Sequence, residues 1–323
     1  MKLFTSILVT AAVMTAGASA QIADKAKVES ILMLKKGNPE KVYILGSTEA
    51  DLSIVKSLQA AAPVKYSRAE IKSIYMKEPK AFGASMALFE GRKYAEAQKQ
   101  FSALKEKYKD LGALPGNHAT QAGFYELECM RKQLNVAGLT NAVSKFDVSS
   151  LTNPTMLQQV EVYKFWELVQ KKDWARIDTL AAEWEKKNVP GSFRAQIAYC
   201  HGLALEGLNR PIDALDTFAK AMTTDFTKSE EISRESVYAA LRVYANMSDV
   251  KDAMDAWKSA DEDPNSNGYK MLIEANSLAR LYDKMGLGAG VDLPAETSVG
   301  NLEAFENEQF NPVGSDSTVR FIA

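Results

Sequence analysis

The sequence contains few of the residues from which most active sites are built. Its 323 residues include only two histidines and two cysteines. The motifs HExxH, GxxxxGK, GxSxG and CxxC, which mark zinc hydrolases, phosphate-binding loops, serine hydrolases and thiol oxidoreductases, are all missing. A site assembled from carboxylates that lie far apart in the chain would leave no such motif, and this is the alternative to a non-catalytic protein. The sequence therefore predicts a protein that is not an enzyme and that carries neither a cofactor nor a metal.

An excess of charge of either sign is missing as well. The chain has 39 Lys and Arg residues against 41 Asp and Glu residues, a formal net charge of −2. A protein that binds nucleic acid or an anionic membrane surface through its charge needs a basic footprint. We therefore expect no nucleic acid among its partners. After residue 20 no stretch approaches the roughly eighteen apolar residues of a membrane-spanning helix, so no transmembrane segment is expected in the mature chain.

The longest apolar run lies at the start of the chain. Lys2 precedes an apolar stretch over Leu3–Val13, and an Ala-Ser-Ala tripeptide follows at residues 18–20. A positive start, a short apolar segment and a small-residue cleavage site are typical of a secretory signal peptide. We therefore predict a signal peptide over residues 1–20 and a periplasmic or secreted protein, which could associate with the bacterial envelope. The sequence does not choose between these locations.

Residues 21–78 show the pattern of short β-strands. Apolar residues alternate with polar ones between Val28 and Met76, and Gly and Pro separate the runs. This pattern predicts four or five short antiparallel strands, with one helical turn near Ser67. The layout resembles the small SH3-like β modules found at the front of some exported bacterial repeat proteins. A module of this size has a thin core, so we expect it to pack against the segment that follows.

Helical spacing begins at residue 79. A small residue followed four positions later by a bulky one recurs along the chain, once in reversed order: Ala97/Phe101, Ala142/Phe146, Ile177/Ala181, Ala214/Phe218 and Ala253/Trp257. With Gly202 as a further point of close helix approach, this pattern resembles the tetratricopeptide repeat. Stacked hairpins bury a stripe of apolar residues that one hairpin cannot bury alone. The alternative is an irregular helical domain without true repeats.

The resemblance implies a mostly α-helical chain. Residues 79–286 would form a TPR-like α-solenoid of about five helical hairpins, closed by a capping helix over Gly268–Met285, with a flexible tail over residues 287–323. Cys129 and Cys200 would then lie two repeats apart, farther than the roughly 7 Å that a disulfide allows between Cα atoms. We therefore expect two buried free thiols.

In the tetratricopeptide family the first helix of each hairpin lines a concave groove that binds peptides. Transferring this register to the present chain predicts a partner-binding groove formed by Phe82, Arg131, Trp166, Tyr199, Tyr238 and Arg242. Aromatic residues and Arg are favoured at binding hot spots. The function implied is a non-catalytic scaffold or adaptor of the cell envelope that holds a protein or peptide on its concave face. In the alternative interpretation, several of these residues are simply core between helices.

Two further binding functions remain open. Trp166, Trp174 and Trp184 would suit a glycan-binding or polysaccharide-binding protein if their rings were exposed. The segment from Asp263 to Glu274 has oxygen-bearing residues at alternate positions, then a glycine and a final Glu, as in the EF-hand calcium loop. The alternative for this segment is a turn in which Asn265 or Asn267 caps the next helix.

Overall fold

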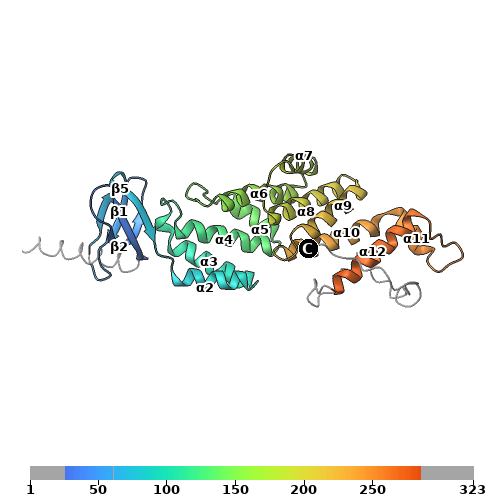
Figure 1. Ribbon diagram of the computed structural model, residues 1–323, viewed down its shortest axis with the longest axis horizontal. Coiled ribbons are helices and arrows are strands. Elements are labelled where there is room, and N and C mark those ends of the chain that lie inside the picture. The colour runs from blue at the N-terminus through green and yellow to red at the C-terminus, as the bar shows by residue number, and fades with distance from the viewer. Residues whose placement is uncertain (1–25, 61, 285–323) are drawn as a thin grey trace, which may run out of the picture. The chain divides into compact units, whose positions relative to one another are not determined.

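The computed structural model describes residues 26–60 and 62–284 (Figure 1). The chain is mostly helical, with a small antiparallel five-stranded sheet near its N-terminus. The predicted signal peptide (1–20) and tail (287–323) lie outside the described residues. Internal contacts divide the chain into two compact units, residues 1–170 and 171–323, which we call the N-terminal unit and the C-terminal unit.

The sheet forms where alternation predicts it. Its strands pair in the order β4-β3-β2-β1-β5, and each pairing is antiparallel. A single 3₁₀ turn, η1 (Arg68–Glu70), precedes the last strand, at the predicted position. The strands are β1 (Val28–Leu34), β2 (Glu40–Ser47), β3 (Asp51–Val55), β4 (Val64–Ser67) and β5 (Ile71–Met76).

The sheet shares its core with the first helices. Alternate strand residues such as Leu32, Ile44 and Ile54 are fully buried, and they belong to one apolar cluster with Phe82 and Phe101 of the following hairpin. This confirms that the small β module packs against its neighbour. The boundary predicted between residues 78 and 79 falls inside the N-terminal unit.

The N-terminal unit continues with a series of helices: α2 (Lys80–Glu90), α3 (Tyr94–Lys107), η2 (Lys109–Leu111), α4 (His118–Lys132), α5 (Val136–Val143) and α6 (Pro154–Lys171). Ala97 and Phe101 are both fully buried on α3, as a small-and-bulky pair requires. Phe146 lies beyond the end of α5 because this helix is shorter than the repeat pattern implies.

The C-terminal unit consists of α7 (Trp174–Trp184), α8 (Gly191–Gly207), α9 (Pro211–Thr224), α10 (Glu230–Asn246), α11 (Ser248–Asp255) and α12 (Asn267–Lys284). Gly202 on α8 faces the ring of Phe218 on α9. A Cβ atom at Gly202 would lie 2.5 Å from that ring, so the glycine allows α8 and α9 to approach closely. This confirms the expected role of Gly202.

Four helix-to-helix turns share one backbone conformation. A non-glycine residue with φ between 54° and 62° lies two positions before the second helix, at Arg92, Leu134, Lys172 and Asn209. In three of these turns the next N–H donates to a carbonyl five residues earlier, from residues 93, 135 and 210. This is the hydrogen bond of a Schellman motif. The turns α2–α3, α4–α5 and α8–α9 are therefore structurally equivalent.

Neither Cys129 nor Cys200 forms a disulfide, and both are buried thiols, as predicted. Burial and the nearby carboxylates of Glu128 and Glu126 raise the pKa of Cys129 to about 12, so this thiol is not a nucleophile at neutral pH. Within the described residues, no helix has both the length and the apolar character needed to cross a membrane.

Candidate functional site

Three of the predicted groove residues are core residues of the N-terminal unit. Phe82, Arg131 and Trp166 are only 3%, 3% and 1% exposed. The ring of Phe82 packs edge-on against that of Phe101, with centroids 5.6 Å apart. A partner cannot touch side chains buried to this extent. For these three residues the structure agrees with the alternative interpretation, in which they form core between helices.

Arg131 is buried because it neutralises an acid. Its Nε and Nη2 atoms each donate to a carboxylate oxygen of Glu128 at 2.9 Å, and the Tyr163 hydroxyl of α6 donates to the same carboxylate at 2.6 Å. Burial alone would raise the pKa of Glu128. The charge and hydrogen bonds of Arg131, with the Tyr163 hydroxyl, outweigh burial and hold the pKa of Glu128 below its usual value. This network joins α4 to α6 and is structural.

The other three predicted residues lie together in the C-terminal unit. Tyr199 on α8 is 9% exposed and packs against Phe218. Tyr238 on α10 is half-buried, and its hydroxyl shares a hydrogen bond with that of Tyr282 on α12. Arg242 on α10 donates twice to Glu206 on α8, at 2.8 and 2.6 Å. The structure therefore brings α8 and α10 side by side, and α12 packs against α10.

One stripe of α10 reaches the surface on this side. Arg234, Glu235, Tyr238 and Arg242 are all partly exposed, and their spacing places them within about 100° around the helix axis. Most of the other residues between them are buried. Together with Glu206 of α8 these residues form a polar and aromatic surface, which we call the first-helix face. Sequence reasoning missed Glu206, although it lies one repeat length, 36 residues, before its partner Arg242.

The tryptophans do not offer a platform for sugars. Trp166 is 1% exposed and Trp184 is 5% exposed, and Lys187 covers the Trp184 ring with its Nζ 3.9 Å from the ring centroid. The indole of Trp174 packs against Gly207, where a Cβ atom would lie 2.4 Å from the indole nitrogen. Carbohydrate stacking needs an open aromatic face. These three tryptophans therefore give no support to a glycan site.

The segment that matches a calcium loop forms a turn between α11 and α12. The Asp263 carboxylate accepts from the Asn265 N–H at 3.0 Å, and Glu274 accepts from the Tyr244 hydroxyl at 3.1 Å. The hydroxyl that accepts from the Tyr269 N–H belongs to Ser266, so the cap is Ser266 rather than Asn265 or Asn267. Within residues 26–60 and 62–284, no group of three acidic, His or Cys side chains could hold a metal.

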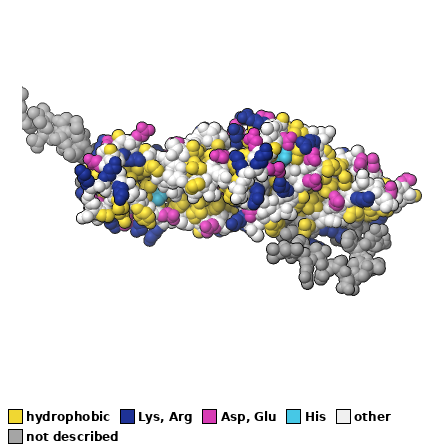
Figure 2. Space-filling view, turned by 45° about the horizontal axis from the view of Figure 1, so that its top comes forward, with side chains coloured by type: hydrophobic (Ala, Val, Ile, Leu, Met, Phe, Trp, Pro, Cys, Tyr) yellow, Lys and Arg dark blue, Asp and Glu magenta, His cyan; other side chains and the backbone are white. Residues whose placement is uncertain are grey.

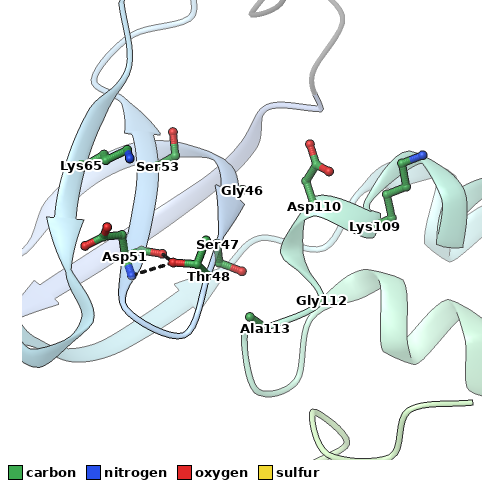
Figure 3. A pocket seen from close by; sticks show the side chains of 10 residues that line it. All are labelled: Gly46, Ser47, Thr48, Asp51, Ser53, Lys65, Lys109, Asp110, Gly112 and Ala113. Carbon is green, nitrogen blue, oxygen red and sulfur yellow. Dashed lines mark hydrogen bonds between the residues drawn. The ribbon is translucent and has the colours of Figure 1, made fainter.

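A polar hollow of about 420 Å³ lies between the sheet and the segment around η2. Figure 3 shows Asp51 and Lys65 on the sheet side and Lys109 and Asp110 on the opposite wall. The Asp51 N–H donates to the Thr48 hydroxyl at 2.9 Å. The residues that line this hollow include no His and no Cys, and they offer hydrogen bonds rather than a nucleophile activated by a base.

The two histidines do not form a catalytic pair. His118 is buried in the N-terminal unit, where its Nε2 lies 3.2 Å from the carbonyl of Lys77 and burial lowers its pKa. His201 lies in the C-terminal unit with its Nε2 2.7 Å from a carboxylate oxygen of Asp178. Each histidine therefore has a local structural partner.

Comparison with known proteins gives no relative. The chain matches no protein-family model, no curated protein and no solved structure. Its function therefore has to be argued from its own residues.

Proposed function

We propose that the chain is a non-catalytic scaffold or adaptor of the bacterial cell envelope. In this proposal residues 79–286 form a TPR-like solenoid, which is exported by the segment at residues 1–20. The turns at Arg92, Leu134 and Asn209 share one helix ending and the same two-residue spacing to the next helix, as the turns of a repeated hairpin would. The buried pairs Ala97/Phe101 and Ala214/Phe218 give further support.

The observation that carries the binding proposal is the first-helix face. It combines Tyr238 with the Arg242–Glu206 ion pair, whose side chains are 37% and 25% exposed. Tyr and Arg are among the residues that contribute most to protein interfaces. A partly exposed, preformed pair loses little further side-chain freedom on binding. A protein or peptide segment that crosses α8 and α10 could displace water from the exposed parts of both Glu206 and Arg242.

Exchanging the charges of this pair tests the proposal. We expect the double variant Glu206→Arg/Arg242→Glu to keep the attraction between α8 and α10, and hence the melting temperature, while presenting each charge at the wrong place. The partner captured by the wild-type chain from envelope extract should be identified and purified. Its affinity for the double variant should fall at least about tenfold, a loss of about 1.4 kcal/mol. Isothermal titration calorimetry would measure it.

A matched exchange serves as the control. Lys109 and Glu106 form an exposed ion pair in the N-terminal unit, and neither belongs to the first-helix face, so Glu106→Lys/Lys109→Glu should leave the affinity unchanged. Replacing Tyr199 would be a poor test, since this side chain is buried and its loss would lower stability. Equal affinity of the wild type and the Glu206→Arg/Arg242→Glu variant would show that the partner does not bind at this face.

A further inference from the structure

A second recess in the C-terminal unit lies among α7, α8 and α9. It has a volume of about 440 Å³. Apolar side chains from two helices, Ala181, Ile197 and Ala198, line part of it, and Trp184 closes one side. Figure 2 shows basic and acidic side chains gathered over this part of the chain. We call this recess the second-helix cleft.

This cleft is distinct from the first-helix face. His201 of α8 lines the cleft, whereas Tyr199 of the same helix lies near the charges of Glu235, Arg242 and Glu206 in the first-helix face. Two residues along an α-helix are separated by about 200° around its axis, so the two side chains project from nearly opposite sides of α8. A ligand in the cleft would therefore leave the first-helix face free.

The rim of the cleft is basic. It carries Lys187, Arg194 and Lys220 against the single carboxylate of Glu185. Lys220 is neutralised by Glu185 at 2.8 Å. Lys187 and Arg194 are both exposed, and within the described part of the chain neither makes an ion pair. Two cations are thus left over beside an apolar floor.

We infer that the second-helix cleft binds an acidic peptide segment that carries an apolar side chain. Carboxylates of the segment would bind Lys187 and Arg194, and the apolar side chain would cover the small exposed part of Ile197 and Ala198, each of which is 6% exposed. Charge-assisted hydrogen bonds to Arg and Lys are stronger than neutral ones. An anionic polysaccharide fits less well, because Lys187 already covers the Trp184 ring against which a sugar would stack.

The test uses the full chain and a defined probe. A fluorescein-labelled dodecapeptide of alternating Glu and Leu should bind with a saturable rise in fluorescence anisotropy. The same peptide with Lys in place of Glu should not bind. The variant Lys187→Glu/Arg194→Glu should weaken binding at least about tenfold. Both side chains are exposed, so the melting temperature should stay within a few degrees. If it does not, Lys187→Gln/Arg194→Gln provides the same comparison without charge reversal.

A charge-matched control distinguishes binding in the second-helix cleft from non-specific electrostatic attraction of the acidic peptide. Lys251 and Lys270 are exposed on α11 and α12 of the same unit, and neither lines the cleft. Lys251→Glu/Lys270→Glu changes the net charge by the same amount as Lys187→Glu/Arg194→Glu. Its affinity for the Glu–Leu peptide should stay within about twofold of the wild-type value. Equal weakening by both double variants would overturn the proposal, as would no binding of the peptide up to about 1 mM.

A heparin oligosaccharide tests the other class of ligand. Binding of heparin that depends on Lys187 and Arg194, without binding of the Glu–Leu peptide, would assign the cleft to a polysaccharide and overturn the peptide. The Glu206→Arg/Arg242→Glu variant should bind the peptide normally. The proposals for the second-helix cleft and for the first-helix face can therefore be rejected independently of each other.

Discussion

Replacing Arg131 by Met should destabilise the N-terminal unit by about 3–5 kcal/mol, the usual loss when one partner of a buried ion pair is removed. Met has nearly the length of Arg, so little packing is lost. The destabilisation comes from Glu128, whose carboxylate would lose both hydrogen bonds from Arg131 and keep the one from the Tyr163 hydroxyl of α6. Urea denaturation at pH 7 would measure the free energy of unfolding.

The pH dependence gives this prediction a definite sign. In the wild-type chain the pKa of Glu128 is lowered on folding, so the ionised pair stabilises above the usual carboxyl pKa of 4.5, and that stability is lost as the pH falls through the lower, folded-state pKa. In Arg131→Met the desolvation of Glu128 loses its largest offset, the charge and hydrogen bonds of Arg131, so the pKa of Glu128 should rise. Protonation then removes the buried charge. The difference in the free energy of unfolding between the wild type and Arg131→Met should therefore become smaller as the pH falls from 7 to 4.

Two control variants test whether the effect of Arg131→Met comes from the buried Arg131–Glu128 pair. Lys220→Met removes an ion pair whose side chains are 56% and 57% exposed, and it should change the stability by less than about 1 kcal/mol. The triple variant Glu128→Leu/Arg131→Met/Tyr163→Phe removes the whole polar network and should recover most of the lost stability. A small, pH-independent effect of Arg131→Met would contradict a buried, stabilising ion pair between Arg131 and Glu128.

The sequence was sufficient to predict the helices and strands, but not every turn between them or every exposed surface. Alternation of apolar residues located the five strands, and the small-and-bulky pairs located the crossing of α8 and α9 at Gly202 and Phe218. The turns were harder to predict. Their left-handed residues include Arg92, Leu134 and Asn209, whereas glycine is the residue that usually signals this conformation. The hydrogen-bonded turn, rather than local preference, fixes their backbone.

The candidate site was predictable only in part, for a physical reason. Helix α4 is buried on nearly all sides, so the rule that a helix has one apolar and one polar face does not apply to it. Arg131 therefore seemed to be a surface residue. The spacing of Glu128 and Arg131, three positions apart, was the available signal of an ion pair on one helix. The exposed stripe of α10 follows the ordinary rule, and there the register placed Tyr238 and Arg242 on one partly exposed face.

Gly268→Ala should destabilise the C-terminal unit by about 2 kcal/mol, within the range for overpacked interiors. Gly268 lies in the first turn of α12, and a Cβ atom there would lie 1.9 Å from the backbone carbonyl oxygen of Asp249 on α11. A backbone atom cannot rotate away as a flexible side chain can, so the two helices must separate. Gly83 on α2 is the matched control. Its Cβ atom would meet nothing closer than 3.6 Å, so Gly83→Ala should stabilise by up to about 1 kcal/mol.

The same substitution tests two explanations for the glycine at position 268. It is required either by the close contact between α11 and α12 or by a calcium-binding turn. If Gly268 is needed for the contact between α11 and α12, the loss of stability in Gly268→Ala should be equal in EDTA and in millimolar calcium. If it is needed for a metal-binding turn, the loss should appear only with calcium, because the ligand stabilises only the folded state that binds it. Since Glu274 is engaged by Tyr244 and the start of α12 touches the backbone of Asp249, we expect equal losses. Calorimetric titration of the wild type and Glu274→Gln with calcium should likewise give no heat of binding in either.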